Sequence, residues 1–125
     1  MITQDAVMTT QEIADRLTEL FKESKWQQAQ EELFSPNIVS LEPAHSPGLQ
    51  TVTGLDNVIK KGEMFQEMVE EVHGGYTRGP IVAGNHISFG IGIDATMKGQ
   101  GRSMMEEIAV YEVKDGKIVK EQFFY

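Results

Sequence analysis

The segment HISFGIGIDATM, residues 86–97, alternates cleanly between apolar and small or polar residues. A period of two over this length indicates a β-strand with one buried face. The apolar face carries Ile87, Phe89, Ile91, Ile93, Ala95 and Met97. The other face carries His86, Ser88, Gly90, Gly92, Asp94 and Thr96. The segment therefore predicts a sheet whose apolar side is covered by another layer.

Two-residue turn signals stand on both sides of this strand. Gly84-Asn85 precedes it, and Asp115-Gly116 follows further along; Asp-Gly is among the strongest short-range signals for a hairpin. Pro80 lacks a backbone donor, which favours an edge or a bulge in its strand. An antiparallel meander of four strands is expected, at residues 76–83, 86–97, 104–113 and 118–125.

Upstream of the meander, three helices are expected. Thr9 and Glu12 form a capping-box pattern, and apolar residues then recur at helical spacing. Ser24 with Gln27 repeats the capping pattern, and Pro36 stops this second helix. The apolar positions of the first two helices are Ile13, Leu17, Leu20, Phe21, Trp26, Ala29 and Leu33.

The third helix follows a short strand expected within residues 50–53. Thr53 and Asp56 are its predicted caps, its apolar residues run from Val58 to Val72, and Gly74-Gly75 is expected to end it. Helices grouped before strands predict an α+β fold in which the helices cover one face of the sheet. Residues 1–8 are expected to be a disordered lead-in to one domain spanning residues 9–125.

The segment Ile38–Glu42, between the second and third helices, contains the residue most suggestive of chemistry. It reads as a strand with Ser40 and Glu42 on one face, followed by a loop over residues 43–50. A carboxylate that faces an apolar cavity has a raised pKa and can act as a general base near neutral pH. The alternative is a solvated carboxylate at a strand end.

Composition limits the classes of function. A net charge of −8 argues against nucleic acid and anionic membranes, which require a basic surface. No apolar run approaches the length of a membrane span, so a cytoplasmic protein is the default expectation. Without cysteine there is no disulfide, thiolate nucleophile or Cys-ligated zinc. His45, His73 and His86 lack the spacing of a metal site, so we expect no metal and no cofactor.

The order of elements resembles the NTF2-like superfamily, and its SnoaL-like and ketosteroid-isomerase-like branch in particular. The resemblance rests on four pieces of sequence that together span most of the chain. These are Leu33-Phe34, Ile38 to Glu42-Pro43, Thr53-Gly54, and Glu106 to Tyr125 with its Asp115-Gly116-Lys117-Ile118 hairpin.

This resemblance implies a curved sheet that wraps three helices into a cone around an apolar pocket, usually within a homodimer. Glu42 falls where ketosteroid isomerases have the aspartate that moves the proton. Thr18 falls at the position of the oxyanion-hole tyrosine, and Ala109 falls, within a residue, at that of the protonated aspartic acid. Both of those hydrogen-bond donors are therefore replaced in this chain.

The terminal hairpin suggests replacements for these donors. A two-residue turn at Asp115-Gly116 would set Val113 opposite Ile118, Tyr111 opposite Lys120, Ala109 opposite Gln122 and Glu107 opposite Phe124. Opposed residues share a face, and the resemblance implies that this face lines the pocket. Tyr111 and Gln122 are then candidate oxyanion donors, although a slip of one residue would exchange the two faces. Glu106 and Glu107, adjacent on one strand, point to opposite faces.

Further residues are candidates for contact with a small apolar ligand, although packing in a filled core is the alternative for each. They are Thr18, Phe21, His45, Met64, Phe65, Met68, Phe89, Ile91, Ala109 and Phe124. The main functional hypothesis is a cofactor-independent isomerase or polyketide-cyclase-like lyase that acts on an apolar carbonyl compound, with Glu42 as base. The alternative is a non-catalytic module for hydrophobic-ligand binding or dimerisation.

Overall fold

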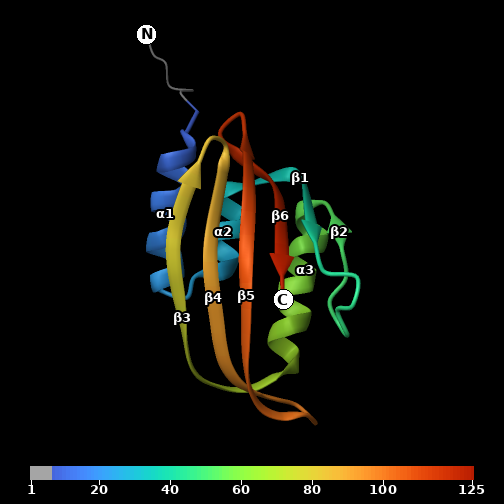
Figure 1. Ribbon diagram of the computed structural model, residues 1–125. Helices are drawn as coiled ribbons and strands as arrows, with labels where there is room; N and C mark the ends of the chain where they lie inside the picture. Colours follow the sequence, from blue (N-terminus) through green and yellow to red (C-terminus); the bar gives the residue numbers. More distant parts are fainter. Residues whose placement is uncertain (1–6) are drawn as a thin grey trace.

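Three helices lie on one side of a six-stranded sheet in the computed structural model, which describes residues 7–125 (Figure 1). The helices are α1 (Thr10–Lys22), α2 (Trp26–Leu33) and α3 (Leu55–Met68). The predicted capping box of α1 is confirmed: the Glu12 N–H donates to Thr9 Oγ1 at 3.1 Å, and the Thr9 N–H donates to Glu12 Oε1 at 2.8 Å.

The sheet contains the predicted antiparallel meander. Its strands are β1 (Phe34–Leu41), β2 (Val52–Thr53), β3 (Val69–Ala83), β4 (His86–Met97), β5 (Gly101–Lys114) and β6 (Lys117–Phe124). Their spatial order is β2-β1-β6-β5-β4-β3, with β1 parallel to β6 and the other neighbours antiparallel. The expected α+β class with three helices on a mainly antiparallel sheet is therefore confirmed.

The boundaries of two helices differ from the prediction. The N-cap of α2 is Lys25 instead of Ser24, and that of α3 is Gly54, and neither helix has a side-chain cap. The third helix also ends at Met68, before the predicted Gly74-Gly75 stop. The residues from Val69 onward pair with β4 and form the long edge strand β3, so they do not continue the helix.

The core lies between the helices and the face of the sheet that we call the inner face. This face carries the alternating side chains of β4 that the sequence predicted to be buried, of which Ile87, Phe89 and Ile91 are at most 5% exposed. They pack against buried residues of α1 and α2 such as Leu17 and Leu33. The expected lead-in at residues 1–8 falls mainly on residues outside the described part of the chain, although Met8 packs against this core.

The register of the terminal hairpin was predicted correctly only next to the turn. Val113 pairs with Ile118 as expected, but a bulge between Glu112 and Val113 shifts the rest of the ladder. A bulge adds one residue to one strand, so each later side chain moves to the opposite face. The pairs beyond the bulge are Tyr111 with Glu121, Ala109 with Phe123, Val110 with Gln122 and Ile108 with Phe124.

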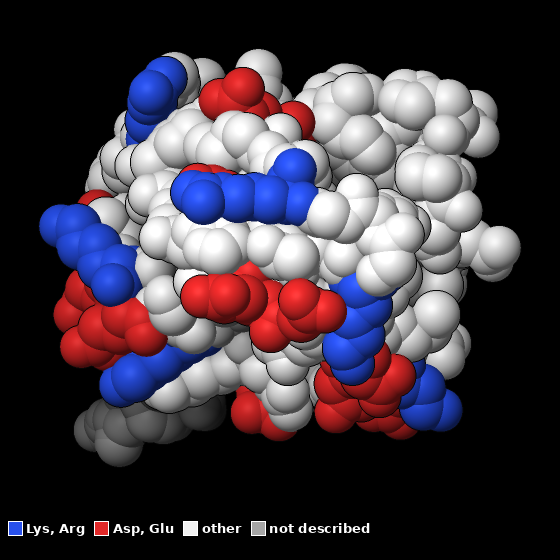
Figure 2. Space-filling view, turned by 90° about the horizontal axis from the view of Figure 1, so that it is seen from below, with Lys and Arg blue, Asp and Glu red and all other residues white. Residues whose placement is uncertain are grey.

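Charges of opposite sign are neighbours on the surface. Arg16 Nε lies 2.6 Å from Glu32 Oε2, and Arg102 Nη2 lies 2.9 Å from Asp94 Oδ2. Figure 2 shows the same mixture at the lower end of the molecule, where Lys and Arg side chains lie next to Asp and Glu. Within residues 7–125, no helix is long and apolar enough to cross a membrane.

Candidate active site

Three polar side chains are buried between α3 and the sheet. Ser40 of β1 is fully buried, Glu121 of β6 is 4% exposed and Lys61 of α3 is 8% exposed. The Lys61 ammonium donates to Ser40 Oγ at 2.6 Å, and the Ser40 hydroxyl donates to Glu121 Oε2 at 2.7 Å. Buried polar groups are stable only when hydrogen-bonded, and this chain of contacts satisfies them.

Glu42 extends this chain toward the surface. Its carboxylate accepts from the Lys61 ammonium at Oε2, 2.8 Å away, and from the Tyr125 hydroxyl at Oε1, 2.6 Å away. The same hydroxyl lies 2.9 Å from Ser46 Oγ in the loop after β1. The Glu42 side chain is only 4% exposed, so both of its oxygens are held within the protein.

The fold explains why these residues meet. Parallel pairing of β1 with β6 sets Ser40 beside Glu121, 81 residues further along the chain. Alternation along β1 places Ile38, Ser40 and Glu42 on the inner face. Helix α3 crosses this face, and Lys61 lies between Val58 and Phe65 on the side of the helix turned toward the sheet. The cluster therefore depends on the topology of the whole domain.

Two carboxyl groups of the cluster have strongly raised pKa values. Burial raises the pKa of Glu121 to about 7, with a smaller contribution from the charge of Glu42, against the opposing effects of Ser40 and Lys61. Burial, and then the charges of Glu42 and Glu121, raise the pKa of Glu107 to about 7. The Lys61 ammonium therefore compensates the charge of three inner-face carboxyl groups only in part, which favours binding of a proton by one of them near neutral pH.

Two tyrosines border this cluster. Burial, followed by the charges of Glu121 and Glu107, raises the pKa of Tyr111 well above its ordinary value. Burial and the hydrogen bond to Glu42 raise the pKa of Tyr125 to about 12. Both phenols therefore keep their protons at neutral pH, and each can donate a hydrogen bond.

The three predicted catalytic residues do not all meet. Tyr111 lies on the inner face, 4% exposed, with its ring near those of Phe21, Phe34 and Phe89. Gln122 lies on the opposite, outer face because of the bulge, paired with Val110. The predicted pairing of Gln122 with Ala109, on the face that lines the pocket, was therefore wrong.

The predicted ligand-contact residues fall into different environments. Phe21, Phe89, Ile91 and Ala109 are buried in the core; Thr18, Phe65 and Met68 are half-buried; His45, Met64 and Phe124 are exposed. The Thr18 hydroxyl donates to the Ala14 carbonyl of its own helix at 2.8 Å. The bulge places Phe124 on the outer face, away from the cluster. The roles of these residues as ligand contacts stay predictions.

Sequence reasoning missed Lys61, Glu107, Glu121 and Tyr125. A signal for Lys61 was present, because Val58, Lys61 and Phe65 recur at helical spacing on one face of α3. Glu121 gave no such signal, since the bulge in the hairpin breaks the alternation that would have placed it inside. Among the described residues, no group of three metal-ligating side chains is positioned to hold a metal ion.

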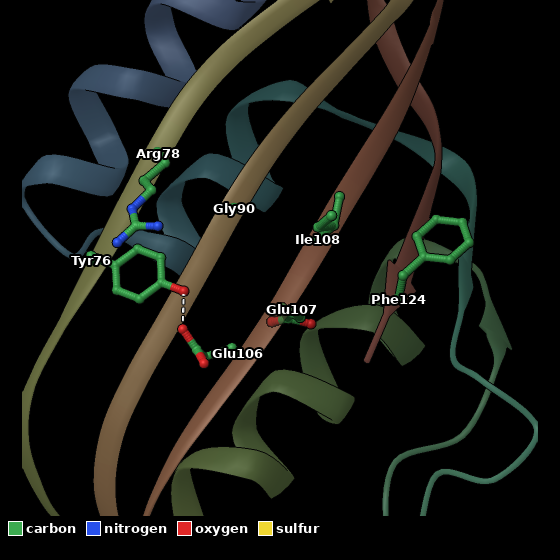
Figure 3. A pocket seen from close by; sticks show the side chains of 7 residues that line it. All are labelled: Tyr76, Arg78, Gly90, Glu106, Glu107, Ile108 and Phe124. Carbon is green, nitrogen blue, oxygen red and sulfur yellow. Dashed lines mark hydrogen bonds between the residues drawn. The ribbon is translucent and has the colours of Figure 1, made fainter.

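A hollow of about 410 Å³ lies on the outer face of the sheet. One cross-strand row runs through it, from Arg78 through Gly90 and Ile108 to Phe124. Figure 3 shows Arg78 next to the Tyr76 ring, whose hydroxyl donates to Glu106; the guanidinium lies 4.3 Å from the ring centroid. Ile108 and Phe124 are about half exposed here. The homodimer that the resemblance implies stays a prediction.

Replacing Gly92 with alanine is expected to destabilise the protein by about 1 to 3 kcal/mol, the usual range for overpacking. A Cβ atom at this position would overlap the Tyr76 ring, which lies directly over the glycine. Gly90→Ala is the matched control on the same strand, because its Cβ would meet Arg78 Cβ at an ordinary 3.7 Å. Urea unfolding measures both variants, and equal stability of the two would contradict this packing.

Comparison with known proteins places the fold in a family. The model of the SnoaL-like domain matches residues 8–125. A solved structure from Mesorhizobium loti, named as a proposed SnoaL-like polyketide cyclase, is 37% identical and has a TM-score of 0.87, covering 94% of this chain and 100% of its own. The search of curated proteins found no match.

Two more distant structures share the fold. An NTF2-like protein from Burkholderia thailandensis has 18% identity and a TM-score of 0.80, covering 94% of this chain and 91% of its own. A protein of ketosteroid isomerase-like fold from Catenulispora acidiphila, in complex with trimethylamine, has 19% identity and a TM-score of 0.70, covering 94% of this chain and 87% of its own. The described domain, with its three helices on a mixed sheet, thus has the NTF2-like fold, and the chain belongs to the family of SnoaL-like domains.

Proposed function

We propose that this protein is a cofactor-independent enzyme that transfers a proton to or from an apolar carbonyl compound. The observation that carries the proposal is the pair of carboxyl groups, Glu107 and Glu121, whose pKa values are raised to about 7. A general base works best when its pKa lies near the operating pH. Groups with strongly shifted pKa values are more frequent at active sites than elsewhere in proteins.

Glu107 is the better candidate for the group that touches substrate. Glu121 is almost fully buried and bonded to Ser40, whereas Glu107 is half-buried on the inner face opposite Ile91. Glu42 was the base expected from the sequence, but the Lys61 ammonium and the Tyr125 hydroxyl occupy its two oxygens. In this proposal the negative charges of Glu42 and Glu121 add to the effect of burial and raise the pKa of Glu107 toward neutrality.

Tyr111 is the proposed donor to the oxygen of the carbonyl compound. Its phenol keeps its proton because burial and the neighbouring carboxylates raise its pKa. A preorganised donor in a site that excludes water stabilises an oxyanion more strongly than water does. The aromatic rings around Tyr111 favour an apolar substrate. The relative from Mesorhizobium loti is named as a proposed polyketide cyclase, and this name is consistent with a substrate that bears carbonyl groups.

Glu107→Gln is expected to lower kcat by roughly 100- to 10,000-fold, the usual contribution of a positioned general base. The assay is deuterium exchange at the carbon next to the carbonyl group, followed by proton NMR in D2O over a panel of apolar ketones. In the wild type the rate should rise with pH and level off above about pH 7, because the base must be ionised.

Glu106→Gln is the control for this experiment, since the neighbouring carboxyl group lies on the outer face with Tyr76. It should leave exchange within a few-fold of the wild type. If Glu107→Gln exchanges deuterium as fast as the wild type, Glu107 is not the base. If ketones bind without any exchange in the wild type, the protein is a non-catalytic ligand-binding module.

A further inference from the structure

A cavity separate from the outer-face hollow lies between α3 and the segment that precedes β2. Its volume is about 330 Å³, at the lower end of the range for pockets that hold small molecules. Its walls are formed by Gly48, Leu49, Gln50, Val52, Asn57, Lys60, Lys61 and Met64. Met64 is the one lining residue that the sequence predicted to contact a ligand, and the proposed proton transfer at Glu107 does not use this cavity.

One face of α3 forms a wall of the cavity. Asn57, Lys60, Lys61 and Met64 stand at positions i, i+3, i+4 and i+7, the spacing that places side chains along one side of a helix. The opposite wall comes from the segment Gly48–Val52, which contributes Leu49 and Val52. The apolar side chains of this wall therefore face a pair of consecutive lysines, Lys60 and Lys61.

The charge of the lining favours an anion. Two of the lining residues are cations and none is a carboxylate. Lys60 is exposed and makes no ion pair with any residue in the range 7–125. This local surplus of positive charge contrasts with a protein whose net charge is −8, and complementary charge both attracts and orients a ligand.

Lys61 connects this cavity with the buried carboxyl groups. An ammonium has three N–H donors, and Lys61 uses two of them, on Ser40 at 2.6 Å and on Glu42 at 2.8 Å. The Phe123 ring centroid lies 5.6 Å from the same nitrogen. Among the acceptors of residues 7–125, none takes the third donor, which remains for a ligand.

We propose that the cavity is a second binding site, which takes a small carboxylic acid with an apolar chain. The carboxylate is held by Lys60 and by the remaining donor of Lys61, and the chain lies against Leu49, Val52 and Met64. This proposal does not depend on proton transfer at Glu107. It does predict communication between the two sites, because the bound anion and Glu42 then share one ammonium.

The expected communication is uptake of protons when the anion binds. Lys61 lowers the pKa values of both Glu107 and Glu121, and the other titratable groups that face the cluster are Glu42, Tyr111 and Tyr125. A second anion on Lys61 weakens its effect on these carboxyl groups, so their pKa values rise further. At pH 7 the complex should therefore bind more protons than the free protein.

Hexanoate, with hexylamine as its cationic counterpart, tests the proposal in the protein of residues 1–125. In NMR titrations at pH 7, hexanoate should shift backbone amide signals within residues 48–52 and 57–64, and hexylamine should not. Lys60→Gln should weaken hexanoate binding about tenfold, which corresponds to about 1.4 kcal/mol. Lys98→Gln, an exposed lysine in the β4–β5 turn, is the matched control and should bind hexanoate like the wild type.

A second variant and a second measurement complete the test. Leu49→Asp places a carboxylate in the wall and should abolish binding without disturbing the core, because Leu49 lies outside it. Calorimetry in two buffers of different ionisation enthalpy should detect proton uptake with hexanoate. The proposal is overturned if hexylamine binds as well as hexanoate, if Lys60→Gln and Leu49→Asp leave binding unchanged, or if the shifts scatter over the surface.

Discussion

Replacing Lys61 with methionine is expected to lower the free energy of unfolding by roughly 3 to 5 kcal/mol at pH 8, as for other buried ion pairs that lose one partner. Methionine keeps most of the length and apolar contact of the lysine stem but removes the charge. Glu42 and Glu121 would then be buried without their cation, and Ser40 would lose a donor. Chemical denaturation at pH 8 measures this loss.

The loss should be smaller at pH 5, because protons can then neutralise the carboxyl groups that lysine no longer compensates. Lys60→Met is the matched control, since the neighbouring lysine is exposed and unpaired within the described chain. It should change stability by no more than about 0.5 kcal/mol, as is usual at surface positions. Equal effects of the two substitutions at pH 8 would mean that the buried ion pair does not stabilise the fold.

Glu121→Gln is expected to have little effect at pH 5 and to stabilise the protein by up to roughly 2 to 3 kcal/mol at pH 8.5. The pKa of Glu121 is about 7 in the folded protein, against an ordinary value of 4.5. The folded state therefore binds more protons than the unfolded state between these values, and stability falls as pH rises through this window. Glutamine keeps the size and the acceptor for Ser40 but cannot ionise.

The measurement is urea unfolding of the wild type and the variant at several pH values between 5 and 8.5. The wild type should lose stability as pH rises, and the variant should show a shallower slope. Glu67→Gln, on the exposed part of α3, should follow the wild type at every pH. A wild type whose stability rises with pH throughout this range would contradict a raised pKa at Glu121.

The sequence was sufficient for the architecture because the relevant signals are local. Alternation over residues 86–97, the Asp115-Gly116 turn and the capping box at Thr9 each depend on residues close together in the chain. Local rules failed where pairing with a distant strand decided the outcome. Residues 69–75 continue the helical pattern of α3, yet β4 pairs with them and makes them a strand.

The candidate site was only partly predictable for the same reason. Glu42 was found because it closes a strand with clear alternation, but its partners come from α3, from β6 and from Tyr125. A single bulge beside Val113 reversed the faces of β6, so that Glu121 replaced Gln122 on the inner side. Alternation alone cannot locate a bulge, because the extra residue is fixed by the geometry of the folded hairpin.

The protonation of Glu107 and Glu121 can be followed directly by an NMR titration of the side-chain carboxyl carbons of the glutamates, with Glu107→Gln and Glu121→Gln used for assignment. We expect these two inner-face carboxyl groups to hold their protons up to neutral pH. The signals of Glu107 and Glu121 should titrate near pH 7. If both signals titrate near the ordinary glutamate pKa of 4.5, the cluster is a set of simple ion pairs and proton transfer at this site is contradicted.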